Sequence, residues 1–143
     1  MSYTVDLLDG LARLLDSAGL GTYRPDSPYA EGETAITIAA TPPAPDRVIC
    51  LSAYPVAESA VLTDTTTGIQ VRTRAGPDPR EVTALDDAVF DVLHGSGPHT
   101  WGNARVQLIF RASAAPIGAD GSGRAERSSN YYARAHRRAL NLE

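Results

Sequence analysis

Residues 68–95 constrain what this chain can fold into more than any other stretch, because they predict a strand leading directly into a helix: GIQVRTRAGPDPREVTALDDAVFDVLHG. The first residues alternate between apolar and polar side chains, which is the period-two pattern of a half-buried strand. Ile69, Val71 and Thr73 occupy one face of that strand. The Gly-Pro pair at 76–77 then ends it, since both residues interrupt regular structure.

The second half of the stretch carries the start and stop signals of a helix. Asp78 fits an N-cap, Pro79 the first helical position and Glu81 the acidic partner of a capping box. Gly95 fits a left-handed C-cap. Between them, apolar residues recur at spacings of three and four: Val82, Leu85, Val89 and Leu93. An amphipathic helix directly after a strand covers one face of a sheet, so this stretch predicts the centre of a small α/β sandwich.

The rest of the chain predicts one more helix and four more strands. Residues 4–18 place leucines on one helical face and charges largely opposite, and Gly19 ends the pattern. Apolar runs, most of them alternating with polar residues, predict strands at 34–40, 47–54, 104–112 and 126–138. The connections are a turn-rich segment at 21–33, a stiff proline-rich connector at 42–46, a polar connection at 55–68 and a flexible glycine-rich loop at 113–125.

These elements predict an α+β fold in the order α-β-β-β-α-β-β. We expect a small two-layer α/β sandwich, with a mostly antiparallel sheet of about five strands and two helices on one face. In the strand at 104–112, Val106, Leu108 and Phe110 are expected to share a face. The 143 residues fit a single domain spanning 1–143. The sequence shows no membrane span and no signal peptide, so we expect synthesis in the cytoplasm and no membrane partner.

Composition argues against several classes of function. The net charge is −4, which is untypical of proteins that bind duplex DNA by neutralising its phosphates. All 13 basic residues are arginine, which indicates the coding bias of GC-rich DNA. The single cysteine, Cys50, excludes an intrachain disulfide and a cysteine-based zinc cluster. Cys50 lies in an apolar run, where a free cysteine usually behaves as a small hydrophobic residue.

No catalytic, cofactor-binding or metal-binding constellation emerges from the motifs. His94, His99 and His136 have neither metal-ligand spacing nor a neighbouring carboxylate cluster. The string GADGSGR at 118–124 does not match a phosphate-binding loop, and it leads into a predicted strand and not into a helix. The sequence therefore predicts a protein that is not an enzyme and that holds no cofactor.

Three segments, in this order, resemble a known family. They are an N-terminal helix ending in LLDSAGLG, the stretch GIQVRTRAGPDPREV, and GADGSGRAERSSNYYARAHR near the C-terminus. Together they resemble the minor capsid and tail terminator proteins of tailed phages of the siphophage type that infect actinobacteria. The resemblance covers about residues 4–138, and its most specific parts are residues 70–79 and 120–132.

The resemblance implies a structural virion protein at the junction of tail and neck. Tail terminators form hexameric rings on the head-proximal end of the tail tube, end its polymerisation and join the tail to the neck. The implied partners are further copies of the chain, the tail tube protein and the neck stopper (head-completion) protein. DNA would pass through the lumen without specific binding, which an acidic chain favours because it repels phosphates.

Residues expected at subunit or partner contacts are four arginines and two aromatic residues: Arg72, Arg74, Arg124, Arg127, Trp101 and Tyr131. The arginines and tyrosines near the C-terminus fit either single-stranded nucleic acid or ion pairs with an acidic neighbouring subunit. Other functions also stay open: a head-completion or stopper protein, a tail-tube-like subunit, a cellular domain that binds a small ligand, and an enzyme.

Overall fold

The strand that leads directly into a helix is present in the computed structural model, which describes residues 2–143. β4 (Asp64–Arg74) is followed by α2 (Pro79–Leu93), whose N-cap Asp78 accepts a hydrogen bond from the Arg80 backbone N–H. The other helix, α1 (Tyr3–Ser17), begins at the N-cap Ser2. The remaining strands are β1 (Thr22–Tyr23), β2 (Ala35–Ile38), β3 (Val48–Glu58), β5 (His99–Trp101), β6 (Ala104–Ala119) and β7 (Ala125–His136).

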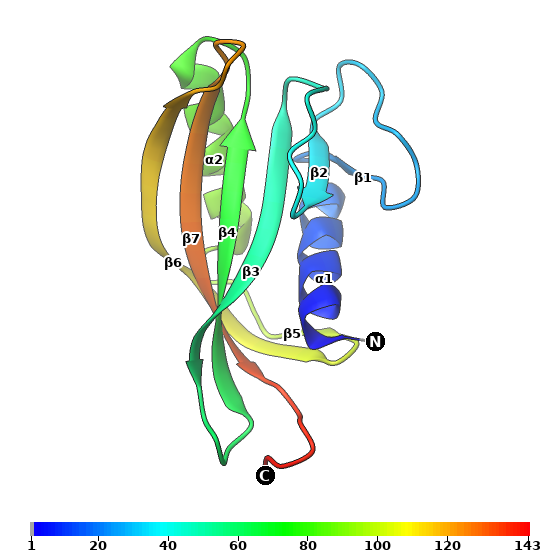
Figure 1. Cartoon of the computed structure of the whole chain (residues 1–143), viewed down its shortest axis with the longest axis vertical. Coiled ribbons are helices and arrows are strands. Elements are labelled where there is room, and N and C mark those ends of the chain that lie inside the picture. The colour runs from blue at the N-terminus through cyan, green and yellow to red at the C-terminus, as the bar shows by residue number, and fades with distance from the viewer. Residues whose placement is uncertain (1) are drawn as a thin grey trace.

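All seven strands form one curled mixed sheet, in the order β1-β2-β3-β4-β7-β6-β5 (Figure 1). β2 pairs in parallel with both β1 and β3, and the other pairs are antiparallel. The α+β class and the two helices on one face are confirmed. The prediction of about five mostly antiparallel strands in the order α-β-β-β-α-β-β is wrong, because the observed order is α-β-β-β-β-α-β-β-β. β1 and β5 span two and three residues, which is too short for a periodic pattern.

Two hairpins extend beyond the lengths that the sequence predicted. β3 and β4 continue through most of residues 55–68, and β6 continues through residues 113–119, which were predicted to be loops. Only a turn at 120–124 separates β6 from β7. Pro55 and Pro116 argued against strands in these segments, because proline is rare inside a sheet. In the structure each proline lies next to a shift in strand register, where a β-bulge accommodates it.

A third register shift changes which side chains of β6 reach the core. The shift falls between Val106 and Leu108. It buries Val106 and Ile109 and leaves Leu108 exposed, so the prediction that Val106, Leu108 and Phe110 share a face is wrong. A bulge inserts one residue into a strand and therefore reverses the alternation beyond it.

One hydrophobic core lies between the sheet and the two helices. α1 contributes Leu7, Leu11 and Leu15, and α2 contributes Val89 and Leu93. The facing strand residues come from five strands and are almost fully buried: Ile36, Ile49, Leu51, Ile69, Val71, Val106, Ile109 and Tyr131. A smaller cluster on the opposite face contains Ala35, Val48 and the buried Cys50. Burial of this apolar surface is the main stabilising contribution to the fold.

Gly10 allows a close contact between α1 and Trp101. It lies in the middle of α1, against the ring of Trp101 in β5. A Cβ at this position would overlap the Trp101 ring carbons Cγ, Cδ2 and Cε3. Glycine costs a helix interior about 1 kcal/mol relative to alanine, so here close packing outweighs helix propensity.

We therefore predict that Gly10→Ala destabilises the protein, although alanine favours helix. Overpacking against Trp101 should lower the free energy of unfolding by about 1–3 kcal/mol in denaturant titrations. Gly121→Ala is the matched control, because a Cβ there meets no atom within 4 Å, and it should change stability by less than about 0.5 kcal/mol. A Gly10→Ala protein more stable than the parent would contradict the packing argument.

Candidate assembly surfaces

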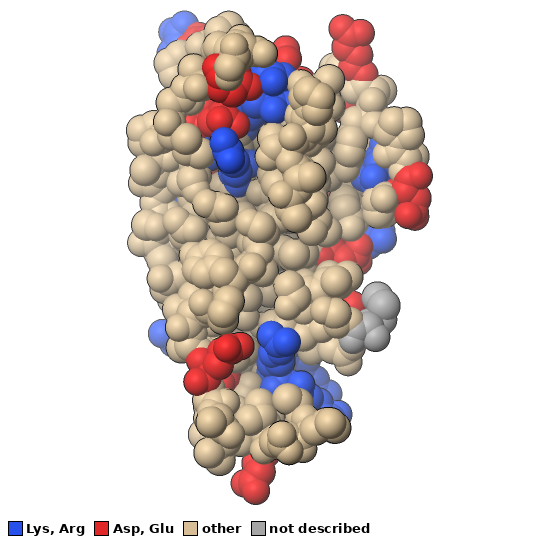
Figure 2. All heavy atoms as spheres, in the orientation of Figure 1, with Lys and Arg blue, Asp and Glu red and all other residues tan. Residues whose placement is uncertain are grey.

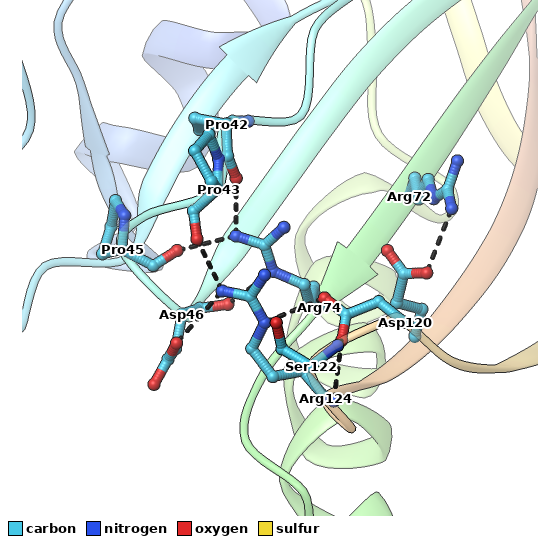
Figure 3. Close-up of polar contacts among 10 residues, drawn as sticks. Pro42, Pro43, Pro45, Asp46, Arg72, Arg74, Asp120, Ser122 and Arg124 are labelled. Atoms are coloured by element: carbon cyan, nitrogen blue, oxygen red, sulfur yellow. Dashed lines mark hydrogen bonds and ion pairs between the residues drawn. The ribbon is translucent and has the colours of Figure 1, made fainter.

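Arg74, one of the residues expected at a subunit contact, holds the proline-rich connector of its own chain (Figure 3). It lies at the end of β4 and only 4% of its surface is exposed. Its Nε donates to the Asp46 carbonyl at 2.9 Å, and one Nη donates to the carbonyls of Pro42 and Pro45 at 2.7 and 2.8 Å. Arg74 thereby ties residues 42–46 to the sheet.

Arg124 fastens the β6–β7 turn to the same connector. Its guanidinium donates to Asp120 Oδ2 at 2.8 Å, to the Pro43 carbonyl and to Asp46 Oδ1 at 3.1 Å (Figure 3). Burial lowers the pKa of Arg74, and the neighbouring Arg124 charge lowers it further. Hydrogen bonds from the Arg124 backbone N–H and from Ser122 lower the pKa of the Asp120 carboxyl. The two guanidinium groups therefore hold the same connector through different carbonyl oxygens, and Arg124 also binds the carboxylates of Asp46 and Asp120.

Arg72 and Arg127 form ion pairs on opposite faces of the sheet. Arg72 pairs with Glu126 at 3.0 Å across β4 and β7, and its side chain is 44% exposed. Arg127 reaches the helix side, where its Nε donates to Asp86 of α2 at 3.2 Å. Asp86 is buried and also accepts from the Ser129 hydroxyl at 2.7 Å, so this network joins α2 to β7.

The two aromatic candidates lie apart from the arginines. Tyr131 is fully buried in the core, and burial together with the nearby Asp86 charge raises its pKa. Trp101 stacks on His99, with ring centroids 4.5 Å apart, and is partly exposed. It lines an open hollow of about 730 Å³ beside α1, together with Asp6, Asp9 and Arg13.

The structure thus brings Arg72, Arg74 and Arg124 together near the end of β4, while Trp101 is placed at β5 and Tyr131 in the core. Within the chain, Arg74 and Tyr131 are buried and serve its internal packing. Their expected role at subunit contacts stays a prediction, as it does for the other four residues. Arg72 is the most exposed of the four arginines whose ion pairs and contacts are described above.

The open face of the sheet, opposite the helices, is a surface that the sequence analysis missed. A row across four neighbouring strands places Tyr54, Gly68, Tyr132 and Phe110 directly opposite one another. The Tyr54 ring lies over Gly68, where any Cβ would overlap it, and its hydroxyl donates to Asn130 Oδ1 at 3.1 Å. A tyrosine and a glycine in neighbouring strands are the signal that could have indicated this packing.

Charge is scarce across the middle of this open face. In Figure 2 the arginine, aspartate and glutamate residues lie towards the two ends of the molecule and along its right-hand side, and the central surface is formed by other residues. Towards the arm, Arg134 is exposed and stacks over Phe110, with 5.5 Å between the ring centroid and the guanidinium carbon. The middle of the open face therefore carries little charge, although the chain has a net charge of −4.

Two long strand edges have no partner strand within residues 2–143. β2 pairs with β3 only along Val48–Leu51, so the outer edge of β3 is free over residues 52–58. β5 pairs with β6 only along Ala104–Val106, and the loop after α2 covers Ile109 and Arg111. The outer edge of β6 is consequently free over residues 112–119. The two edges belong to opposite sides of the sheet.

The β3–β4 hairpin projects from the body as an arm, and the C-terminal segment lies beside its tip (Figure 1). Backbone hydrogen bonds join the Glu143 N–H to the Val61 carbonyl and the Arg137 N–H to the Thr63 carbonyl. Several large apolar side chains on the arm and the segment are exposed: Val56, Val61, Leu62 and Leu140. Such projecting apolar residues are common at protein interfaces.

Within residues 2–143, no group of three or more histidine, cysteine or acidic side chains is arranged to hold a metal ion. The helices in that range are also too short or too polar to cross a membrane.

The Arg74 network predicts a measurable loss of stability. Arg74→Met removes three hydrogen bonds from backbone carbonyls that are otherwise shielded, so the free energy of unfolding should fall by about 1–3 kcal/mol in urea. Arg13→Met is the control, because the Arg13 side chain is 63% exposed and water screens its pair with Asp9, so this variant should lose much less stability. Equal losses in the two variants would show that the connector does not depend on Arg74.

The fold has a counterpart among solved virion structures. It is similar to a chain of the structure described as "Virion of native gene transfer agent (GTA) particle", with a TM-score of 0.56 and 14% sequence identity. The alignment covers 88% of this chain and 84% of that chain. At this identity the similarity shows the fold alone. No curated protein sequence matches the chain.

The family itself is shown by the sequence. A family model described as "Bacteriophage tail terminator protein" matches residues 14–137, which contain α2 and every strand from β1 to β7. The chain therefore belongs to the bacteriophage tail terminator protein family.

Proposed function

We propose that the protein is the tail terminator of a phage-like particle. Copies of the chain form a ring, which we take to be a hexamer, at the head-proximal end of the tail tube. The ring ends polymerisation of the tube and joins the tail to the stopper protein of the neck. The observation that carries this proposal is the family match over residues 14–137.

The shape of the chain supports a role in assembly. The β3–β4 arm and the β6–β7 turn extend from opposite ends of the molecule (Figure 1). A ring subunit placed between a tube and a neck needs contacts at both of its ends as well as with its neighbours. The exposed apolar residues of the arm, Val61 and Leu62 among them, suit one such contact, because their burial is favourable.

We propose a structural and not a catalytic role, which the surroundings of the histidines support. His94 Nδ1 accepts a hydrogen bond from the Arg111 backbone N–H at 3.0 Å, and His136 Nδ1 lies 2.9 Å from the Thr63 hydroxyl. His99 stacks on Trp101, and burial lowers its pKa. All three rings thus have packing or hydrogen-bonding roles within the fold.

For the lumen, we propose that the ring lets DNA pass without specific binding. The net charge of −4 on each copy disfavours lasting contacts with phosphates. The middle of the open face offers few cations to them (Figure 2). Strong attachment to DNA would need the opposite, a concentration of basic side chains that neutralises several phosphates at once.

Removal of the protein from its particle tests the proposal. Without it, tail tubes should polymerise past their normal length and fail to join heads, which electron microscopy of the lysate would show. Supplying the intact chain from a plasmid should restore tails of uniform length. In a reconstruction of the complete particle, we expect its density as a ring between tube and neck.

Other phenotypes would contradict the terminator role and point to the alternatives. Tails of normal length beside heads that have lost their DNA would indicate a stopper or head-completion protein. Complete absence of tubes would indicate a tail-tube-like subunit. Particles of normal form without the protein would refute a role in the virion. They would favour a small-ligand-binding domain, with the hollow beside Trp101 as its site.

A further inference from the structure

The two free strand edges are alike in a way that internal packing does not explain. Residues 52–58 of β3 read SAYPVAE and residues 112–119 of β6 read ASAAPIGA. The segments are similar in length, and Glu58 is their one charged residue. A long uncharged edge is a template for another strand, and soluble proteins usually protect it with charges or cover it.

Each edge also carries features that restrict how a strand can pair with it. Pro55 and Pro116 each remove one N–H donor, and β-bulges lie beside both prolines. These features oppose unlimited pairing, such as aggregation into fibres. They leave the remaining backbone groups available, and they make one alignment of an incoming strand better than its neighbours. The edges are therefore suited to pairing in a single register.

We propose that the β3 edge of one copy, residues 52–58, pairs with the β6 edge of the next copy, residues 112–119. The contact extends the sheet from subunit to subunit. This inference rests on the proposed function, because it assigns the contact between neighbours in the terminator ring. The partner is a second copy of this chain.

Pairing of unlike edges is favoured over pairing of like edges. The two free edges lie on opposite sides of the same sheet, so a head-to-tail contact satisfies both in every copy of a closed ring. A β6–β6 contact would close a two-fold dimer and leave each β3 edge unpaired. The unlike contact therefore pairs both edges of every subunit through a single kind of interface.

The charged residues at the ends of the two edges favour antiparallel pairing between the β3 strand and the β6 strand. In that direction Glu58, whose side chain is 54% exposed, approaches Arg111 at the beginning of the β6 edge. In a parallel arrangement Glu58 would instead approach Asp120, at the end of that edge, and two carboxylates would repel each other. Arg111 stacks over Phe90 and keeps 29% of its side chain exposed, so it remains accessible to an incoming carboxylate.

Disulfide trapping between separately expressed chains tests the contact. In a Cys50→Ala background, which removes the native thiol, one chain carries Ala57→Cys and the other Ser113→Cys. Both residues are exposed in the isolated chain. After concentrated purified chains are mixed and oxidised, we expect the mixed disulfide dimer to exceed either homodimer at least fivefold. A single chain with both cysteines should form a ladder of higher oligomers.

Position controls decide whether the trapped contact is the proposed one. Ala57→Cys paired with Ile117→Cys samples the parallel direction and should cross-link less than the antiparallel pair. Asp26→Cys, in the exposed segment before β2, should not cross-link to Ser113→Cys above the level of random collision. A dominant Ser113–Ser113 product, or cross-linking that ignores position, would overturn the proposal.

A variant without cysteine chemistry provides an independent readout. Ala114→Lys places a charge on the exposed part of the β6 edge and should reduce the mass of assemblies in light scattering, while the thermal unfolding midpoint of the single chain stays unchanged. Ala30→Lys, on an exposed loop away from both edges, should assemble like the parent. Undiminished assembly of Ala114→Lys would overturn the edge contact.

These results are separable from the terminator role. Cross-linking at the two edges, in a particle whose ring lies elsewhere than between tube and neck, would preserve the contact and refute the role. A ring at that junction whose subunits do not cross-link through these residues would preserve the role and refute the contact.

Discussion

Burial of both helices against one face of the curled sheet is the interaction on which the rest of the structure depends. Leu7, Leu11 and Leu15 of α1 and Val89 and Leu93 of α2 meet strand residues that are almost completely buried. Because one face of the sheet is thereby used for the core, the other face and the two lateral edges remain for contacts outside the chain. The surfaces available for assembly are therefore the open face and the free edges of the sheet, which the core does not use.

Polar networks around that core hold the segments that carry no apolar stripe of their own. Arg74 and Arg124 fasten the proline-rich connector and the β6–β7 turn, and Asp86 joins α2 to β7. These side chains supply the shape of the subunit, whereas the free edges of β3 and β6 and the arm with Val61 and Leu62 offer surface for neighbours.

Much of the core could be predicted from the sequence, whereas the open face of the sheet and its free strand edges could not. The capping signals at Asp78 and Pro79 and the apolar spacing of α2 are local, so they predicted the helix correctly. Residues 113–119 were predicted to be loop because an exposed hairpin strand has no buried face and so no alternation to detect. The contacts of Arg74 with the proline-rich connector could not be predicted, because sequence does not show which carbonyl groups a guanidinium will meet.

The sequence by itself determined the class of the fold, the helix boundaries, the buried faces of most strands and the family, because these depend on local periodicity and on motifs such as residues 70–79 and 120–132. Only the tertiary structure decided the strand order, the parallel pairing of β2 with β3, and the bulge that buries Ile109 in place of Leu108. It also decided which strand edges lack a partner. Those features depend on contacts between residues distant in the chain, for which local patterns carry no signal.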